Sequence, residues 1–319
     1  MSLRVAVVQF SPKIGQVKGN IDTASKLVAK LEPDTVDLVC LPEMIFSGYV
    51  FPDVSAISPF LEDSQTGPTS HFCSDLAKRL RCYVIAGYPE RLAPDEQRRP
   101  VLDQKPYQAI TEEVGANSAI LYGPTGEFIS NYRKTNPFET DMTWSKPGTG
   151  FAVLKLPQPL RTVALGICMD LNTQPPAIWT LDGPYEIANF ALEKKANILI
   201  LLNAWLDSGE EPEEAKDWRT LNFWAARLRP LWATTEELED EGEDSSSSDS
   251  GGEQRQTSVV DATAQGHETT VVICNRCGQE NGKTFAGSSA VFSLQRGSGR
   301  PKLLHSMTRK AEGVEVWTV

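Results

Sequence analysis

The sequence VALGICMDLN at residues 163–172 decides the fold class of this chain of 319 residues. Its apolar residues, which are typical of β-strands, lead into a cysteine and then into polar residues. This is the pattern of a buried strand that ends abruptly. A side chain at such a corner is held rigidly at the edge of the sheet where α/β proteins bind their ligands. Cys168 is therefore either a nucleophile or, like most unpaired cysteines, a buried space-filling residue.

The segments around this stretch alternate between strand and helix patterns. A strand at residues 3–10, a helix from about residue 20 to 31 and an almost wholly apolar strand at 36–41 form a β-α-β opening. An α/β layered domain follows from this order. Further strands are predicted at 83–87, 117–122, 127–132, 161–167, 198–202, 269–274 and 288–293, and further helices at 71–80, 187–195 and 217–228.

Composition and charge narrow the class of protein. The net charge of −11 opposes a nucleic-acid partner, and 40% hydrophobic residues are typical of a globular chain. We expect no membrane-spanning segment, because no apolar run approaches the roughly 18 residues that a spanning helix needs. Six scattered cysteines do not form a disulfide framework. We therefore expect a cytoplasmic protein, with the nucleus as a further compartment.

One segment departs from the α/β pattern. Residues at about 234–257 are acidic and rich in serine, a composition that cannot bury a core. Strand patterns resume after it, so we interpret it as a disordered surface insertion within a single domain that spans residues 1–319.

Three chemically active side chains follow predicted strands. Glu43 comes after the strand at 36–41, Lys134 after the strand at 127–132, and Cys168 after the strand at 161–167. Taken one at a time, Glu43 and Lys134 also fit solvated surface charges. Because the carboxyl ends of strands meet at one crevice of an open α/β sheet, all three could also lie together.

A carboxylate, an ammonium and a thiol suffice for acyl transfer. Glu43 would take the thiol proton as general base and later activate water. Cys168 would attack an amide and form a thioester. Lys134 would stabilise the oxyanion, helped by the backbone N–H of Met169.

Five motifs stand in order along the chain: RVAVVQ at 4–9, LPE at 41–43 with FSGY at 46–49, YRKT at 132–135, GICMDL at 166–171, and Asn275 and Arg276 with Gly278, Glu280, Gly282, Phe285, Gly287 and Ser288. Together they resemble the nitrilase, or carbon-nitrogen hydrolase, superfamily. The resemblance implies a Glu43–Lys134–Cys168 triad, a four-layer α-β-β-α sandwich and pairing of two copies through a helix layer.

Within the superfamily the chain is similar to the protein N-terminal amidase branch of fungi. That branch implies hydrolysis of the side-chain amide of N-terminal Asn or Gln, with release of ammonia, as a step of the N-degron pathway. For binding of the substrate we single out Met169, and for its α-ammonium Asp170, Asp141 and Asn203. The branch motifs are PEMIFSGY at 42–49, ICMDLN at 167–172, NAW at 203–205 and LNFWAAR at 221–227.

Alternatives remain open at this point. The chain could act on a small-molecule amide, as ω-amidases and carbamoyl-type enzymes do, or serve as a non-enzymatic scaffold whose acidic insertion recruits a partner. The superfamily often has a second pocket carboxylate after the lysine, and either Glu139 or Asp141 could supply it. We expect no metal or other cofactor, because Cys274 and Cys277 lack the further ligands of a zinc site.

Overall fold

The computed structural model describes residues 2–101, 111–174, 176–234 and 266–319. Over these ranges the main strands form two six-stranded sheets. The first has the order β16 (Gly313–Thr318), β1 (Arg4–Gln9), β2 (Leu38–Leu41), β3 (Tyr83–Arg91), β6 (Gly115–Tyr122) and β7 (Phe128–Arg133). The second has the order β15 (Lys302–Ser306), β14 (Ala290–Gln295), β11 (Glu268–Asn275), β10 (Ile198–Asn203), β9 (Thr162–Ile167) and β8 (Ala152–Lys155).

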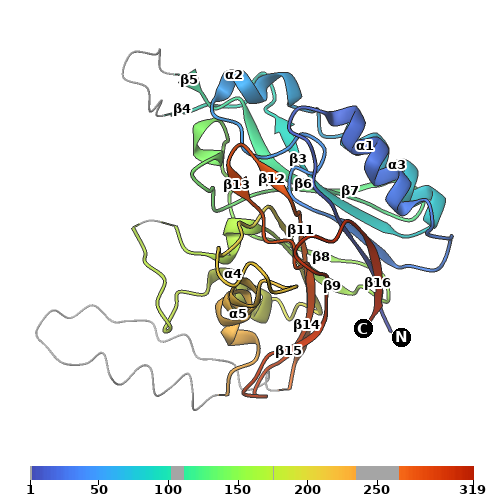
Figure 1. Cartoon of the computed structure of the whole chain (residues 1–319), viewed down its shortest axis with the longest axis vertical. Coiled ribbons are helices and arrows are strands. Elements are labelled where there is room, and N and C mark those ends of the chain that lie inside the picture. Colours follow the sequence, from blue (N-terminus) through green and yellow to red (C-terminus); the bar gives the residue numbers. More distant parts are fainter. Residues whose placement is uncertain (1, 102–110, 175, 235–265) are drawn as a thin grey trace, which may run out of the picture.

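Helices cover the outer face of each sheet (Figure 1). On the first sheet lie α1 (Val17–Val28) and α3 (Pro68–Leu80), and on the second α4 (Glu186–Glu193) and α5 (Trp218–Arg227). The shorter elements are α2 (Val54–Ile57), the 3-10 turns η1 (Ser58–Phe60), η2 (Asp141–Thr143), η3 (Cys168–Leu171) and η4 (Arg229–Leu231), and two small hairpins, β4 (Pro100–Val101) with β5 (Thr111–Glu112) and β12 (Gln279–Glu280) with β13 (Lys283–Thr284).

Alternation along the strands explains the layers. Val5 and Val7 of β1 point into a core shared with Leu165 of β9, whereas Ala6 and Val8 point toward α1 and α3. Side chains of a strand face opposite sides in turn, so a strand that is apolar throughout must be covered on both faces. The two sheets therefore stack face to face between two helical layers, which confirms the predicted four-layer α-β-β-α sandwich.

The sequence located the central strands and the edge strand β7, but not the other three edge strands. The predicted hairpin of residues 117–122 and 127–132 is the antiparallel pair β6–β7. Strands β8, β15 and β16 were not predicted, since their residues are only partly buried and carry a weaker apolar pattern. Residues 235–257 of the predicted insertion lie outside the described residues, and the single-domain organisation stays a prediction.

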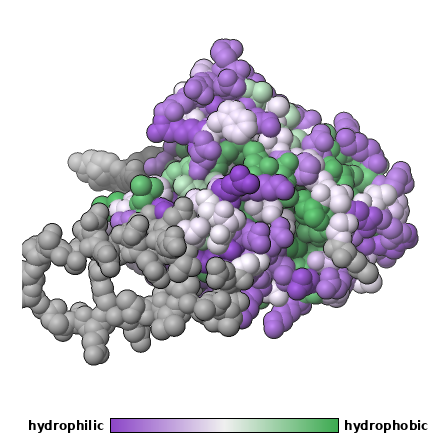
Figure 2. Space-filling model, turned by 90° about the horizontal axis from the view of Figure 1, so that it is seen from below, coloured by the Kyte–Doolittle hydropathy of each residue, from purple (hydrophilic) through white to green (hydrophobic). Residues whose placement is uncertain are grey.

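The described residues include no helix that is both long enough and apolar enough to cross a membrane. On the face shown in Figure 2, hydrophilic side chains occupy much of the rim and apolar ones reach the surface nearer the centre. Among large apolar side chains, Ile178 and Leu181 are the most exposed, at 81% and 64%. Both belong to the segment that follows η3 and therefore lie close in sequence to Cys168.

A buried carboxylate, Glu62, binds the first turn of helix α3. Glu62 accepts hydrogen bonds from the backbone N–H of Thr69, at 2.8 Å, and from the Thr69 hydroxyl, at 2.9 Å. A side chain at Gly67 would clash with it, because an added Cβ would lie 2.7 Å from the Glu62 carboxylate. Burial raises the pKa of Glu62 from its ordinary value of 4.5 to about 7.

We predict that Glu62 makes stability pH-dependent. Its pKa is higher in the folded than in the unfolded chain, so the folded state binds more protons between pH 4.5 and 7, and the contribution of this group to stability falls as the pH rises through that window. Glu62→Gln removes this pH dependence. Between pH 4.5 and 8, the free energy of unfolding of the variant should rise relative to that of the wild type by up to about 3 kcal/mol. Urea unfolding at both pH values measures it, and a stability difference that does not change with pH would contradict the prediction.

Candidate active site

Glu43 lies just beyond the carboxyl end of β2, in the first sheet, and is fully buried. Pro42 ends β2, and the backbone around Glu43 rests directly on Gly87 of β3: an added Cβ on this glycine would lie 2.5 Å from the Glu43 Cα. The Gly87 N–H donates to the Pro42 carbonyl, and the Ile45 N–H donates to the Gly87 carbonyl. The close contact with Gly87 of β3 therefore fixes the direction in which the Glu43 carboxylate can point.

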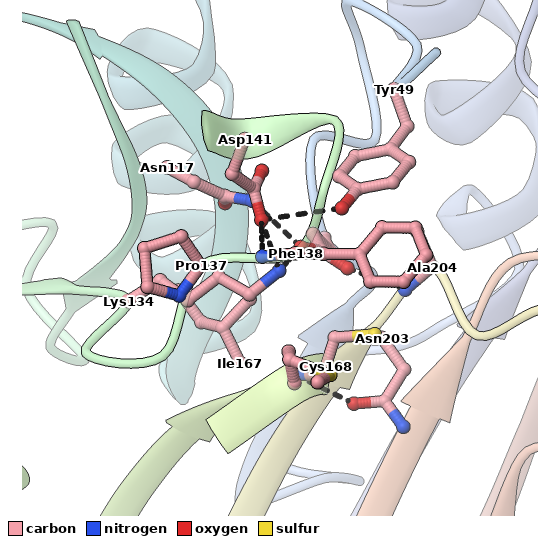
Figure 3. Close-up of polar contacts among 12 residues, drawn as sticks. Tyr49, Asn117, Lys134, Pro137, Phe138, Asp141, Ile167, Cys168, Asn203 and Ala204 are labelled. Carbon is pink, nitrogen blue, oxygen red and sulfur yellow. Dashed lines mark hydrogen bonds and ion pairs between the residues drawn. The ribbon is translucent and has the colours of Figure 1, made fainter. Parts of the chain in front are cut away.

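Lys134 follows β7 and inserts its ammonium between two carboxylates (Figure 3). Its Nζ lies 2.7 Å from Glu43 Oε1 and 2.7 Å from Asp141 Oδ2, and all three side chains are buried. A lysine has three N–H donors, and these two bonds use two of them. Within the described residues the third has no acceptor, so it is free for an oxygen atom of a substrate.

The second pocket carboxylate is Asp141, at the start of η2. Its Oδ1 accepts from Asn117 Nδ2 at 2.9 Å, and its Oδ2 accepts from Lys134, from the Phe138 N–H and from the Tyr49 hydroxyl. Glu139 instead lies at the surface and pairs with Lys283. The alternative left open by the sequence is thereby resolved in favour of Asp141.

Cys168 reaches the same place from the second sheet. It is the first residue of η3, directly after β9, and has a φ of +43°, a left-handed conformation that is uncommon for residues other than glycine. Its backbone N–H donates to Asn203 Oδ1 at 3.1 Å. The predicted strand-to-turn corner is present. Glu43 and Lys134 lie on one sheet and Cys168 on the other, so the three residues come from both sheets of the predicted sandwich and not from the strand ends of a single open sheet.

Electrostatics explains the resting state of these groups. Burial raises the pKa of the Cys168 thiol well above its usual value, the Glu43 charge raises it further, and Lys134 opposes both. Burial also raises the pKa of Glu43, with Lys134 acting in the opposite direction. The pKa of Lys134 is raised because the two carboxylates outweigh its desolvation. These directions favour a neutral thiol beside a charged ammonium.

Two residues expected to bind substrate have other partners. Asp170 is buried, and its oxygens accept from the Tyr132 hydroxyl and from three backbone N–H groups, those of Thr135, Asn136 and Ile167. Four such bonds occupy the capacity of a carboxylate. Asp170 therefore holds the η3 turn against the Lys134 loop. Asp141 also accepts four bonds, but three of them are on Oδ2 and one is on Oδ1. The expected role of either carboxylate toward a substrate ammonium stays a prediction.

Met169 and Asn203 remain candidates. Met169 is half-buried in the turn, and no acceptor for its backbone N–H is found in the described ranges. Asn203 is buried at the end of β10, where its Oδ1 orients the turn and its Nδ2 has no partner within the described structure. The Met169 N–H is thus available beside Cys168, and its role toward an oxyanion stays a prediction.

Sequence reasoning missed three groups of the site. Asn117 Nδ2 donates to both carboxylates, 2.7 Å from Glu43 Oε1 and 2.9 Å from Asp141 Oδ1. The Ala204 N–H donates to Glu43 Oε2 at 2.7 Å, and the Tyr49 ring lies 5.5 Å from Lys134 Nζ. Asn117 could have been found by counting the β6–β7 register back from the predicted turn, because its carbonyl accepts from the Lys134 N–H.

Comparison with known proteins gives the family. The sequence pattern of the carbon-nitrogen hydrolases matches residues 4–180, more than half of the chain. The chain belongs to the carbon-nitrogen hydrolase family. Among curated members it is 28% identical to the protein N-terminal amidase of Schizosaccharomyces pombe, over 97% of this chain and 96% of that protein. It is 25% identical to the human ω-amidase NIT2, over 54% of this chain and 56% of that protein.

Solved structures share the fold of this family member. A crystal structure of an N-terminal amidase with an Asn-Glu peptide superimposes with a TM-score of 0.80 at 20% identity, over all of this chain and 97% of that one. An amidase from Nesterenkonia sp. gives a TM-score of 0.63 at 18% identity, over 99% of this chain and 90% of that one.

We predict an acid limit to activity that Glu43 sets. A general base must be ionised, and the pKa of Glu43 lies above its ordinary 4.5, so kcat/KM should fall as the pH drops through a value above 4.5. The raised pKa values of Cys168 and Lys134 predict that neither residue causes a loss of activity between pH 7 and 9. A pH profile of kcat/KM measures the acid limit. The basic limit is measured as kcat at saturating substrate, because a free substrate with an α-amine itself titrates at about pH 7.7–8.0. An acid limb below pH 4.5, or a decline of kcat before pH 9, would contradict the assignment.

Gly87→Ala should displace Glu43 and lower kcat/KM while the protein still folds. The added Cβ would meet the backbone at Glu43 and at the Met44 nitrogen, 2.7 Å away, so Glu43 must shift. A displacement of about 1 Å from the reacting group typically costs about a hundredfold in rate. The matched control is Gly313→Ala, where an added Cβ has no atom within 4 Å. Equal kcat/KM values for the two variants would show that Gly87 does not position Glu43.

Proposed function

We propose that the protein hydrolyses the side-chain amide of N-terminal Asn and Gln in peptides and proteins, yielding Asp and Glu and releasing ammonia. The observation that carries the chemistry is the hydrogen-bonding capacity left unused in the cluster at Cys168. Within the part of the chain that the structure describes, Lys134 Nζ uses two of its three N–H groups, and Glu43 Oε2 accepts the Ala204 N–H alone. A donor for an oxyanion and an acceptor for a thiol proton are thus provided beside one sulfur.

In the first half-reaction, the Cys168 sulfur attacks the amide carbon while its proton passes to Glu43. The carbonyl oxygen becomes an oxyanion, which accepts hydrogen bonds from Lys134 Nζ and the Met169 N–H. Collapse of the tetrahedral species breaks the C–N bond, and the proton on Glu43 moves to the departing nitrogen, which leaves as ammonia. A thioester remains on Cys168.

In the second half-reaction, water replaces ammonia in the site. Glu43 takes one proton from the water as its oxygen adds to the thioester carbon, and the same two donors hold the second oxyanion. The C–S bond then breaks, and the proton returns from Glu43 to the sulfur. The product is a carboxylic acid, which ionises at neutral pH and leaves the site as an N-terminal Asp or Glu.

Support for a peptide substrate comes from the relatives. The fungal proteins to which the chain is similar carry the name protein N-terminal amidase, and matched crystal structures hold peptides that begin with Asn or Gln. The buried Asp170 is saturated and Asp141 Oδ2 is fully used, so we propose that loop carbonyl oxygens receive the α-ammonium, with Asp141 Oδ1 as the remaining carboxylate acceptor. By exposing N-terminal Asp or Glu, the reaction would feed the N-degron pathway in the cytoplasm, with a homodimer as the proposed assembly.

A second candidate is a small-amide hydrolase. The human and yeast ω-amidases match about half of this chain, at 25% and 26% identity. The chemistry of the triad would be the same, and the two proposals differ only in what surrounds the amide.

The proposal is tested by measuring ammonia release from four peptides, beginning with Asn or Gln, each with a free or an acetylated α-amine. We expect release from the free peptides alone, and loss of at least about a thousandfold in Cys168→Ala, because the nucleophile is removed. Deletion of residues 234–257 should leave the rate unchanged. Activity on free small amides but on none of the peptides would favour the second candidate, and full activity of Cys168→Ala would overturn both.

A further inference from the structure

Tyr49 shapes the site without belonging to any helix or strand. Its ring is buried, its hydroxyl donates to Asp141 Oδ2 at 3.2 Å, and Lys134 Nζ lies 5.5 Å from the ring centroid. Figure 3 shows the phenol pointing toward Asp141 from the side opposite Asn117. Because the loop that carries Tyr49 has no ladder of its own, some other contact must fix it.

That contact is a buried carboxylate from the hairpin β12–β13. Glu280 Oε1 accepts the backbone N–H of Tyr49, at 2.7 Å, and that of Val50. The carbonyl of Val50 accepts from Asn281 Nδ2 at 3.0 Å, so the hairpin holds this peptide from both sides. Gly48 lets the loop approach this closely: its φ is +84°, and an added Cβ would lie 2.9 Å from Glu280 Oε2.

Glu280 is itself anchored to the second sheet. Arg276, which follows β11, donates through Nη1 to Glu280 Oε2 at 2.7 Å, and its guanidinium stacks on Phe285 at 3.9 Å. The Arg276 N–H donates to the carbonyl of Asn203, at the end of β10. A continuous set of contacts therefore runs from the sheet that carries Cys168 to the loop that carries Tyr49.

Burial makes the Arg276–Glu280 ion pair costly to break. Both side chains are almost completely buried, and Arg276 Nε has no partner in the described structure. Removing one member of a buried ion pair leaves the other charge uncompensated. The pair is thus a rigid bracket between two loops, rather than a surface contact that could be lost without effect.

We propose that Glu280 is a positioning residue of the active site, acting through Tyr49. It holds the turn at residues 48–50 so that the phenol hydroxyl stays on Asp141, which in turn orients the Lys134 ammonium. The inference rests on the proposed function only for the choice of substrate, since these contacts are made within the protein and involve no substrate atom. Glu280 touches none of the groups that react.

The test is a double-mutant cycle with Glu280→Gln and Tyr49→Phe. The amide keeps an oxygen for the two N–H groups but loses the charge that Arg276 binds, and we expect kcat to fall about tenfold with KM changed less than about threefold. Tyr49→Phe removes only the hydroxyl. If Glu280 acts through that hydroxyl, Glu280→Gln should cost less than about twofold in the Tyr49→Phe background. Equal losses in both backgrounds would overturn the proposal.

Two further measurements keep the result interpretable. Hydrogen exchange at the amides of residues 46–51 should accelerate in Glu280→Gln and remain unchanged in Glu315→Gln, a matched control at an exposed position of β16. Unchanged exchange in both would also overturn the proposal. If Glu280→Gln fails to fold, Asn281→Gly replaces it in both measurements, because this residue is exposed and its φ of +45° suits glycine.

The cycle is measured on whichever amide the wild type hydrolyses, and the exchange experiment needs no activity at all. Wild-type activity on small amides only, together with a non-additive cycle, would refute the proposed substrate and keep the role of Glu280. Activity on N-terminal Asn peptides with an additive cycle would do the reverse.

Discussion

The structure depends on one buried cation. Lys134 places an ammonium between two sheets, where a lone charge would be prohibitively costly, and two carboxylates at 2.7 Å compensate it. The cluster as a whole has an excess of negative charge, which the amide of Asn117 and the hydroxyl of Tyr49 spread over further hydrogen bonds. A catalytic lysine in this position needs both carboxylates. One acts as the general base, and the other keeps the lysine protonated and fixes its position.

Hydrogen bonds separate the three carboxylates buried near the site. Asp170 accepts two bonds on each oxygen and has no capacity left for a proton in transit. Asp141 accepts three bonds on Oδ2 and one on Oδ1, and Glu43 accepts two on Oε1 and one on Oε2, so each of these two keeps a position on one oxygen. Hydrogen-bond capacity therefore separates the structural Asp170 from the two carboxylates that bind Lys134, and Asp141, with one bond more, is held more firmly than Glu43.

Most of the fold and the three central residues could be predicted from the sequence, for a physical reason. Strands buried on both faces are continuously apolar, so a charged or thiol side chain directly after one stands out, as Glu43 and Cys168 do. The choice between Glu139 and Asp141 could not be made, because it depends on the path of an irregular loop. Glu280 was visible only as part of a family motif, since its partners are 230 and 231 residues away in sequence.

The neutral thiol has a consequence for chemical durability. Oxidants and simple alkylating agents react with thiolates, and the raised pKa of Cys168 keeps its sulfur protonated and buried at rest. The sulfur is expected to react fastest with a molecule that brings an electrophilic carbon to Glu43 and an oxygen to Lys134. Reagents that need a standing thiolate should therefore modify this enzyme more slowly than enzymes whose resting cysteine is ionised.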